Sequence, residues 1–305
     1  MATQTRDRTV ERPLNVVLRP SSPAEAAFRS AVLAPGFEPA PGLNLEYLGG
    51  KTLPQLTFTM VYLGAWDPGD RAQLDRAVPA AMTDPGLNDV LAQYFPGRLV
   101  STAFAGSRTY ADVVPARLDK PDVERLVAEL DTSGALAGLD FALSVVCLLL
   151  PREVVLAEGE VSSEVGLGGY HGSVHLRRNG RRRQTVYYSV AVYSEGSNGI
   201  VAFDEPWKNV CATLYHELCE VRTDPDVEDA IRAGATPAAE RLLGWYSPRG
   251  GEIGDIPMAE AGGDLARVMK EVPLADGSGT VPIQLMWSNA VGGPEGPTPT
   301  PRWPR

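Results

Sequence analysis

The chain of 305 residues is short of several residue types, and each shortage argues against a class of protein. Its three cysteines, Cys147, Cys211 and Cys219, form no repeated framework and lie in apolar surroundings. We therefore expect buried thiols in a reducing compartment rather than disulfides or metal ligands. Basic residues are also scarce, since 28 lysines and arginines against 38 aspartates and glutamates give a formal net charge of −10. Nucleic acids and anionic membranes bind basic surfaces, so we expect neither as a partner.

Long apolar runs are missing as well. No stretch approaches the roughly 20 apolar residues that a membrane-spanning helix needs. The N-terminal segment MATQTRDRTVERPLNVV carries charges throughout and has no apolar run of signal-peptide length. The composition therefore predicts a cytoplasmic, globular protein.

The two ends of the sequence differ from the rest. Residues 1–12 are polar and charged, which predicts a flexible arm. The last residues read GGPEGPTPTPRWPR, and this richness in proline predicts a flexible tail over 291–305. No clear linker interrupts the sequence between these ends, so we expect a single domain over 13–290.

The middle of the chain predicts a mixture of strands and helices. Residues 55–64 alternate in polarity and are rich in β-branched and aromatic side chains, which indicates a strand. Residues 67–85 begin with an acidic residue and a proline and continue with helical spacing, and 86–95 predict a second, short helix. The continuous apolar run LSVVCLLLP predicts a fully buried strand over 143–150.

A hairpin and a long helix are expected to follow. Asn179-Gly180 is typical of a two-residue turn and predicts a hairpin over 168–193. Val210, Leu214, Leu218 and Val221 form one apolar stripe of a helix over 207–222, which should face the sheet. The order strand, helix, strand, hairpin, helix is also that of the zincin catalytic domain, in which the last helix carries metal ligands. The expected fold class is therefore α+β, with a zincin-like mixed sheet and an active-site helix packed against it.

The segment TLYHELCEVRTDP places His216, Glu217 and Glu220 on this helix. Residues four apart share a helical face, so His216 and Glu220 can bind one object. Imidazole nitrogen and carboxylate oxygen both ligate zinc, at about 2.0–2.2 Å. In HExxH enzymes the glutamate at the position of Glu217 is the general base that acts on water. A surface helix whose polar residues simply face water is the alternative.

A later segment, GWYSPRGGEIGD, offers further carboxylates in Glu252 and Asp255. We expect Glu252 to complete a metal site with His216 and Glu220, with Asp255 orienting the histidine or acting as a ligand itself. A carboxylate that accepts a hydrogen bond from a metal-ligating histidine fixes the tautomer of the imidazole and raises its basicity. An acidic turn without a metal is again the alternative.

Several scattered segments resemble the plant exordium and phosphate-induced protein family. The segment HELCEVRTDP…GWY…GEIGD is similar to the HELAE, TDP or TNP, Trp-Tyr and EIAD-like landmarks of that family. YLGGKTLPQLTFTMVYLGAW, GGYHGS and IQLMWSNA resemble three other landmarks, in the same order along the chain. The resemblance spans about 46–290.

The resemblance implies a site made of His171, His216, Glu217, Glu220, Asp224, Trp245, Tyr246, Glu252 and Asp255. Family members are secreted and associated with the plant cell wall, whereas this sequence shows no signal peptide. Gly169 also stands where the family has a cysteine. The cell-wall role is therefore not carried over, and the resemblance supports a site more than a reaction.

His171 and Tyr246 are the remaining candidates for catalysis. His171 lies on the expected hairpin and has three open roles, which are metal ligand, hydrogen-bond donor to a transition state, and packed core histidine. Tyr246 is a second candidate for stabilising an oxyanion. The third histidine, His175, has no counterpart among the family's landmarks and is expected at the surface.

A set of one histidine and two glutamates formally neutralises a divalent ion. We expect zinc first, with manganese or calcium as alternatives because the ligands are rich in oxygen. The function expected is a zinc-dependent hydrolase, or a tailoring enzyme of zincin type, acting on a peptide or a small molecule with a polarisable carbonyl. The alternative is a non-catalytic protein that binds a ligand such as a carbohydrate, with a structural metal or none. The intact Glu217 favours chemistry, because a structural site would not need it.

Overall fold

The computed structural model describes residues 16–18, 31–178 and 182–296. Its main sheet has the strand order β1-β4-β3-β6-β10-β9. These strands are β1 (Val16–Leu18), β3 (Gln55–Leu63), β4 (Val100–Tyr110), β6 (Ser144–Leu149), β9 (Gly169–Arg178) and β10 (Arg182–Ala191). The four central strands run parallel to one another, whereas β1 and β9 lie antiparallel at the two edges. The sheet is therefore mixed, as expected.

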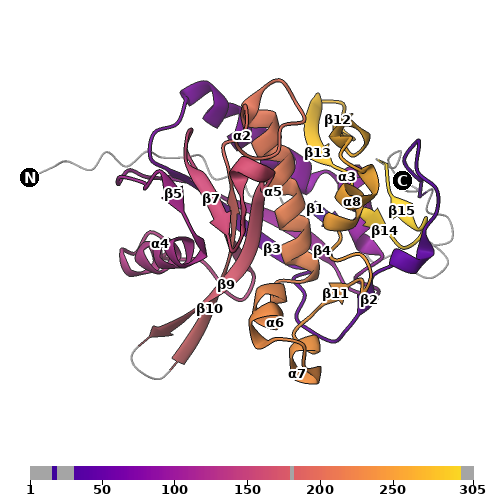
Figure 1. Ribbon diagram of the computed structural model, residues 1–305, viewed down its shortest axis with the longest axis horizontal. Helices are drawn as coiled ribbons and strands as arrows, with labels where there is room; N and C mark the ends of the chain where they lie inside the picture. Colours follow the sequence, from indigo (N-terminus) through magenta and orange to yellow (C-terminus); the bar gives the residue numbers. More distant parts are fainter. Residues whose placement is uncertain (1–15, 19–30, 179–181, 297–305) are drawn as a thin grey trace, which may run out of the picture.

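Helices lie on both faces of this sheet. They are α2 (Pro68–Thr83), α3 (Pro85–Ala92), α4 (Lys120–Thr132), α5 (Pro206–Thr223), α6 (Val227–Ala233), α7 (Pro237–Glu240) and α8 (Asp255–Ala261). Successive residues of a strand point to opposite faces. In β3, Phe58 and Met60 pack into a core with α2, α3 and α5, while Val61 and Leu63 pack into a second core with α4. Figure 1 shows α4 on the other side of the sheet from α2 and α5.

Short strands complete the structure around the main sheet. They are β2 (Glu46–Tyr47), β5 (Arg117–Leu118), β7 (Val155–Glu158), β8 (Val161–Ser162), β11 (Trp245–Tyr246), β12 (Met269–Pro273), β13 (Thr280–Gln284), β14 (Trp287–Ser288) and β15 (Gly293–Pro294). Three 3-10 turns lie at Pro41–Leu43, Ser163–Val165 and Leu265–Arg267. β13 packs on α5, so residues far along the chain lie beside this helix.

The long helix α5 has the orientation that its sequence predicts. The stripe formed by Leu214, Leu218 and Val221 is fully buried in the core that lies against the sheet. The carboxyl end of α5 is held by Arg222, which is fully buried. Its guanidinium donates hydrogen bonds to the carbonyl oxygen of Pro54, at 2.6 Å, and to that of Ser101, at 3.0 Å. Because these acceptors adjoin β3 and β4, Arg222 ties the end of the helix to two central strands.

The expected mixture of strands and helices is confirmed. The strands over 55–64 and 143–150, the two helices over 67–95 and the helix over 207–222 are all present. The hairpin over 168–193 is present as β9 and β10, but its turn at 179–181 lies outside the described residues. The three cysteines are free and buried, as expected.

The ends of the chain are described only in part. Residues 1–15 and 297–305 lie outside the described residues, and with them the expected arm and most of the expected tail. β15 (Gly293–Pro294) lies within the tail expected over 291–305 and pairs with β14, so regular structure continues past residue 290 and the expected boundary was too early. Within the described ranges, every helix is too short or too polar to cross a lipid bilayer.

Candidate metal centre

Three parts of the chain bring titratable side chains together beside the main sheet. The cluster consists of His216, Glu217 and Glu220 from α5, His171 from β9, and Glu252 and Asp255 around the start of α8. Close approach of β9 to α5 depends on Gly169. A Cβ atom there would lie 2.4 Å from the carbonyl oxygen of Val190 and 3.3 Å from Oε1 of Glu217. Any larger side chain at this position would therefore not fit without a shift of the backbone.

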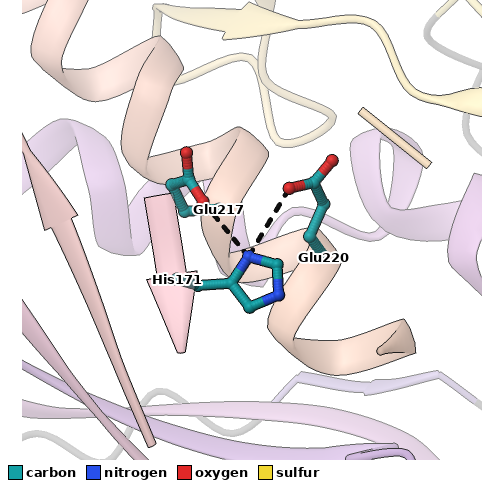
Figure 2. Close-up of side chains that lie close together, drawn as sticks. All are labelled: His171, Glu217 and Glu220. Carbon is teal, nitrogen blue, oxygen red and sulfur yellow. Dashed lines mark hydrogen bonds and ion pairs between the residues drawn. The ribbon is translucent and has the colours of Figure 1, made fainter. Parts of the chain in front are cut away.

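His171 faces two carboxylates of α5 (Figure 2). Its Nδ1 atom lies 3.3 Å from Oε2 of Glu217 and 3.6 Å from Oε2 of Glu220. Its Nε2 atom lies 3.2 Å from the backbone oxygen of Asp224. A carbonyl oxygen only accepts, so Nε2 carries a hydrogen and donates it. The Nδ1 lone pair then points at two carboxylates, an arrangement that is stable only when a proton or a metal ion lies between them.

The ring of His216 is held in the same way as that of His171, but the roles of Nδ1 and Nε2 are exchanged. Its Nδ1 atom donates to Oε1 of Gln284 at 2.9 Å. Its Nε2 atom therefore faces the carboxylates, 3.0 Å from Oε2 of Glu220 and 3.8 Å from Oδ1 of Asp255, where it can hold a proton or a metal ion. Oε1 of Glu217 is farther away, at 4.0 Å. An imidazole whose distal nitrogen is hydrogen-bonded in this way is typical of metal-ligating histidines.

The expected pairing of His216 with Glu220 is present, but Glu252 lies elsewhere. Oε1 of Glu252 is 3.5 Å from Nε2 of His171. The side chain is buried, and Oε1 has no hydrogen-bond partner among the described residues. Among the residues that the structure describes, two groups of potential ligands have their donor atoms within 4.8 Å of one another, and both contain Glu220. One group is His171, Glu217 and Glu220, and the other is His216, Glu220 and Asp255.

The cluster is closed at one end and open at the other. The side chains of His171, Glu217 and Glu220 are only 3–5% exposed. The side chain of His216 is 13% exposed, and that of Asp255 is 57% exposed. A ligand that enters from solvent therefore meets the His216–Asp255 end first.

Charges within the cluster shift the pKa values of the two histidines upward. Burial lowers the pKa of His216, but the carboxylate of Glu220 outweighs this effect and raises it to about 10. Burial likewise lowers the pKa of His171, and the carboxylates of Glu252, Glu217 and Glu220 hold it well above its ordinary value. Each imidazole thus binds a cation, here the proton, more strongly than a histidine in water does.

The carboxylates respond to burial and to one another. Burial raises the pKa of Glu217, and burial together with the charge of Glu220 raises that of Glu252. Burial also raises the pKa of Glu220, but His216 and His171 override it and lower the value to about 2. The charge of Glu220 in turn raises the pKa of Asp255 to about 7. Glu220 is therefore the residue on which the electrostatics of the cluster depend.

The other residues implied by the resemblance surround the cluster. Asp224 is buried, and Oδ1 accepts the backbone N–H of Gly244 at 2.8 Å while its backbone oxygen orients His171. Trp245 packs its ring against Tyr94, with centroids 5.2 Å apart. Burial and then the nearby carboxylates, Glu252 first, raise the pKa of Tyr246. Asp224 and Trp245 thus serve as supports, and Tyr246 lies within electrostatic range of the carboxylates.

Two further residues shape the site and were assigned no role from the sequence. Gln284 holds the ring of His216, and its Nε2 donates to the carbonyl oxygen of Gly254 at 2.6 Å. The N–H of Gly254 donates to Oε1 of Glu220 at 3.1 Å. A Cβ atom on Gly254 would lie 2.5 Å from Nδ1 of His216, so only glycine fits there. The glycine of GEIGD is a sequence signal for such a close approach, whereas nothing local in IQLMW indicates the role of Gln284.

His175, the third histidine, stands apart from the cluster and at the surface, as expected. Its side chain is 30% exposed and its Nε2 lies 2.7 Å from Oδ2 of Asp229. Its Nδ1 lies 3.1 Å from the hydroxyl of Thr185. His175 therefore provides a control for experiments on the other two histidines.

Comparison with known proteins adds no assignment. The chain matches no protein-family model, no curated protein and no solved structure. The resemblance to the exordium family therefore stays a prediction from the sequence.

Proposed function

We propose that this protein is a metal-dependent hydrolase of zincin type, with zinc as the first choice of ion. One observation carries the proposal. Nε2 of His216 lies 3.0 Å from Oε2 of Glu220, and Gln284 occupies the opposite ring nitrogen, so Nε2 is the atom that can bind either a proton or a metal ion next to Glu220. Glu220 and His216 stand on successive turns of α5, as ligands of one ion would.

The fold is compatible with this proposal. Before α5 the chain passes through β3, α2, α3, β4, α4, β6 and the hairpin β9–β10, so the strand, helix, strand, hairpin and helix expected from the sequence occur in that order with β4 and α4 added between them. α5 packs against the sheet with its apolar stripe and keeps His216 at the less buried end of the cluster. This arrangement supports a catalytic helix and does not by itself identify a reaction.

The residues fit a divalent ion in number and in chemistry. His216, Glu220 and Asp255 would hold it, while Glu252 lies next to His171 instead. A bound ion of this kind polarises a carbonyl and makes water a better nucleophile. Imidazole suits zinc and carboxylates suit manganese, whereas calcium takes six to eight oxygen ligands and fits a histidine-containing set less well.

The chain's own side chains supply the remaining parts of a hydrolytic site. Glu217 would accept the proton of the attacking water, because its Oε1 lies 4.0 Å from the metal-facing nitrogen of His216. Tyr246 would donate to a developing oxyanion. The substrate would be a peptide or a small molecule with a polarisable carbonyl, entering at the exposed side of Asp255.

A second candidate function rests on the closed end of the cluster. His171, Glu217 and Glu220 are almost completely buried, and structural metal sites are closed in this way. In that case the protein would bind a ligand, such as a carbohydrate, without converting it. Hydrolytic activity that depends on the metal would favour the hydrolase, whereas ligand binding without such activity would favour this second candidate.

The test begins with protein purified without added metal. We expect at least one equivalent of a divalent ion by elemental analysis, and hydrolysis of some member of a panel of peptide and ester substrates. A chelator should abolish the hydrolysis and added Zn²⁺ should restore it. His216→Ala should lose the ion, whereas the matched control His175→Ala should keep both ion and activity. A wild-type protein that takes up no divalent ion would overturn the proposal.

A further inference from the structure

The cluster contains two groups of potential metal ligands, and Glu220 belongs to both. His171 and Glu217 form one group with Glu220, and His216 and Asp255 form the other with Glu220. Neither group contains both histidines. In a tetrahedral zinc site the ligand atoms lie about 3.3–3.6 Å apart, given bonds of about 2.0–2.2 Å. A single ion would therefore use one of the two imidazoles and leave the lone pair of the other facing carboxylates.

Glu220 stands between the two imidazoles. Its Oε2 atom lies 3.6 Å from Nδ1 of His171 and 3.0 Å from Nε2 of His216. Its Oε1 atom accepts the backbone N–H of Gly254, which holds the carboxylate in this position. Each imidazole has its other nitrogen occupied by a fixed acceptor, the carbonyl oxygen of Asp224 or the amide oxygen of Gln284. Both lone pairs are thus directed toward the same carboxylate.

The charge of the cluster also exceeds what one divalent ion balances. Glu217, Glu220, Glu252 and Asp255 carry four negative charges when ionised. One divalent ion would leave two of these charges uncompensated, and three of the four carboxylates are buried. Glu252 is only 7% exposed and its Oε1 lies 3.5 Å from Nε2 of His171, so this carboxylate adds buried negative charge beside the cluster without belonging to either ligand group. Two divalent ions would balance the charge.

We propose that the protein holds two divalent metal ions bridged by the carboxylate of Glu220. This inference rests on the proposed function in that it assumes a metal at the same cluster. The inner ion takes Nδ1 of His171 and Oε2 of Glu217, while Oε1 of Glu217 stays on the side of His216, where it can act as the base. The outer ion takes Nε2 of His216 and the carboxylate of Asp255. Each ion has one imidazole and at least two carboxylates, a set that suits Zn²⁺ or Mn²⁺. The outer ion is the one that meets a substrate, because Asp255 is 57% exposed.

The test uses the full chain after treatment with a chelator. The protein is loaded with Mn²⁺ or with Zn²⁺, desalted, and analysed for metal per chain, and the Mn²⁺ form is examined by electron paramagnetic resonance. We expect two ions per chain and the exchange-coupled signal of two Mn²⁺ ions about 3.5–4 Å apart, the separation typical of two-metal sites. One ion per chain, with the signal of isolated Mn²⁺, would overturn this inference and leave the proposed function standing. No bound ion would overturn both.

Variants assign the two ions to their groups. His171→Gln should retain the outer ion alone, and Asp255→Asn should retain the inner ion alone, each without the coupled signal. His175→Gln, the matched control outside the cluster, should retain two ions and the coupling. Two ions in both His171→Gln and Asp255→Asn would place the second ion elsewhere and contradict the proposal. Circular dichroism checks the fold of each variant, and the wild-type stoichiometry decides the matter even where a variant does not fold.

Discussion

The Nδ1 atom of His216 lies 2.9 Å from the side-chain oxygen of Gln284, a residue 68 positions later in the sequence. The amide of Gln284 cannot reverse its orientation without loss, because its nitrogen donates to the carbonyl oxygen of Gly254 at 2.6 Å. The oxygen of Gln284 thus keeps the hydrogen of His216 on Nδ1 and directs Nε2 at Glu220. One residue of β13 thereby determines which nitrogen of the α5 histidine is free to bind a metal.

Gln284→Leu should weaken metal affinity by about 10–100-fold, the usual effect of removing a partner that orients a ligand. The variant keeps the size of the side chain but loses the acceptor for Nδ1. Gln284→Glu retains an oxygen at that position and should recover most of the affinity. Competition with a chromophoric chelator measures both values. Equal affinities for Gln284→Leu and the wild type would remove Gln284 from the site.

Glu217→Gln should keep the fold and the ion held with His216 while losing turnover by about 10²–10⁴-fold, because an amide cannot accept the proton of water. Turnover, metal content and ligand affinity are measured on the same preparation. A purely ligand-binding protein would instead show near-normal affinity and no turnover in either form. Unchanged turnover in the variant would exclude Glu217 as the base.

Gly254→Ala should impair metal binding without unfolding the protein. The added Cβ would lie 2.5 Å from Nδ1 of His216 and 2.9 Å from Oε1 of Glu220, so the ligands themselves must shift. Gly42→Ala is the matched control, because its Cβ meets only the end of the flexible Arg249 side chain at 3.4 Å. Elemental analysis and circular dichroism should show metal loss only in Gly254→Ala. Full metal content in that variant would contradict the geometry described for the site.

Removal of the metal should make stability depend on pH through His216. Its pKa is raised from 6.5 to about 10 in the folded protein without metal, since Glu220 outweighs the effect of burial. The folded state therefore holds a proton that the unfolded chain has released. This stabilisation is complete below pH 6.5 and is lost as the pH rises through 10. Urea unfolding of chelator-treated protein measures this effect. Between pH 6.5 and 10 the free energy of unfolding should fall more steeply in the wild type than in His216→Gln. Parallel curves for the two proteins would argue against a raised pKa of His216.

Arg222→Ala should destabilise the protein by roughly 3–5 kcal/mol, because hydrogen bonds to a charged group contribute about 1.5–3 kcal/mol each and several acceptors lose their donor. These acceptors include the carbonyl oxygens of Pro54 and Ser101 and the hydroxyl of Thr102.

Arg232→Ala provides the control for that substitution. Its guanidinium pairs with Glu124 at 2.8 Å but is 53% exposed, so its removal should cost only about 0–1 kcal/mol. Urea unfolding measures both variants, and similar losses of stability would show that Arg222 does not anchor α5.

β4 and α4 are among the elements that were not predicted from the sequence, for different reasons. β4 over Val100–Tyr110 reads VSTAFAGSRTY, and only two of its residues are buried, so its alternation is weak. α4 over Lys120–Thr132 does carry a signal, because Asp119 and Asp122 form a capping box around a proline. The strand over 143–150 was predicted from its continuous apolar run, which matches its complete burial. The strand over 55–64 was predicted from alternation and from β-branched and aromatic residues, and it is present although nearly all of its residues are buried rather than alternating.

The sequence by itself determined the features that depend only on residues close to one another along the chain. The four-residue spacing of His216 and Glu220 places them as neighbours on one helical face, whatever the helix packs against. The apolar stripe of α5 likewise fixed which side of the helix would be buried. These are local properties, since helical periodicity alone decides them.

Only the tertiary structure decided which other groups meet that face. His171 lies 46 residues before Glu217, and no local pattern indicates that β9 places Nδ1 against the carboxylates of α5. The sequence suggested Glu252 as a ligand together with His216 and Asp255 as a residue next to His216; the chain places Asp255 beside His216 as expected, but Glu252 beside His171. Periodicity specifies the faces of each element, but the pairing of faces between distant elements follows from the packing of the whole core.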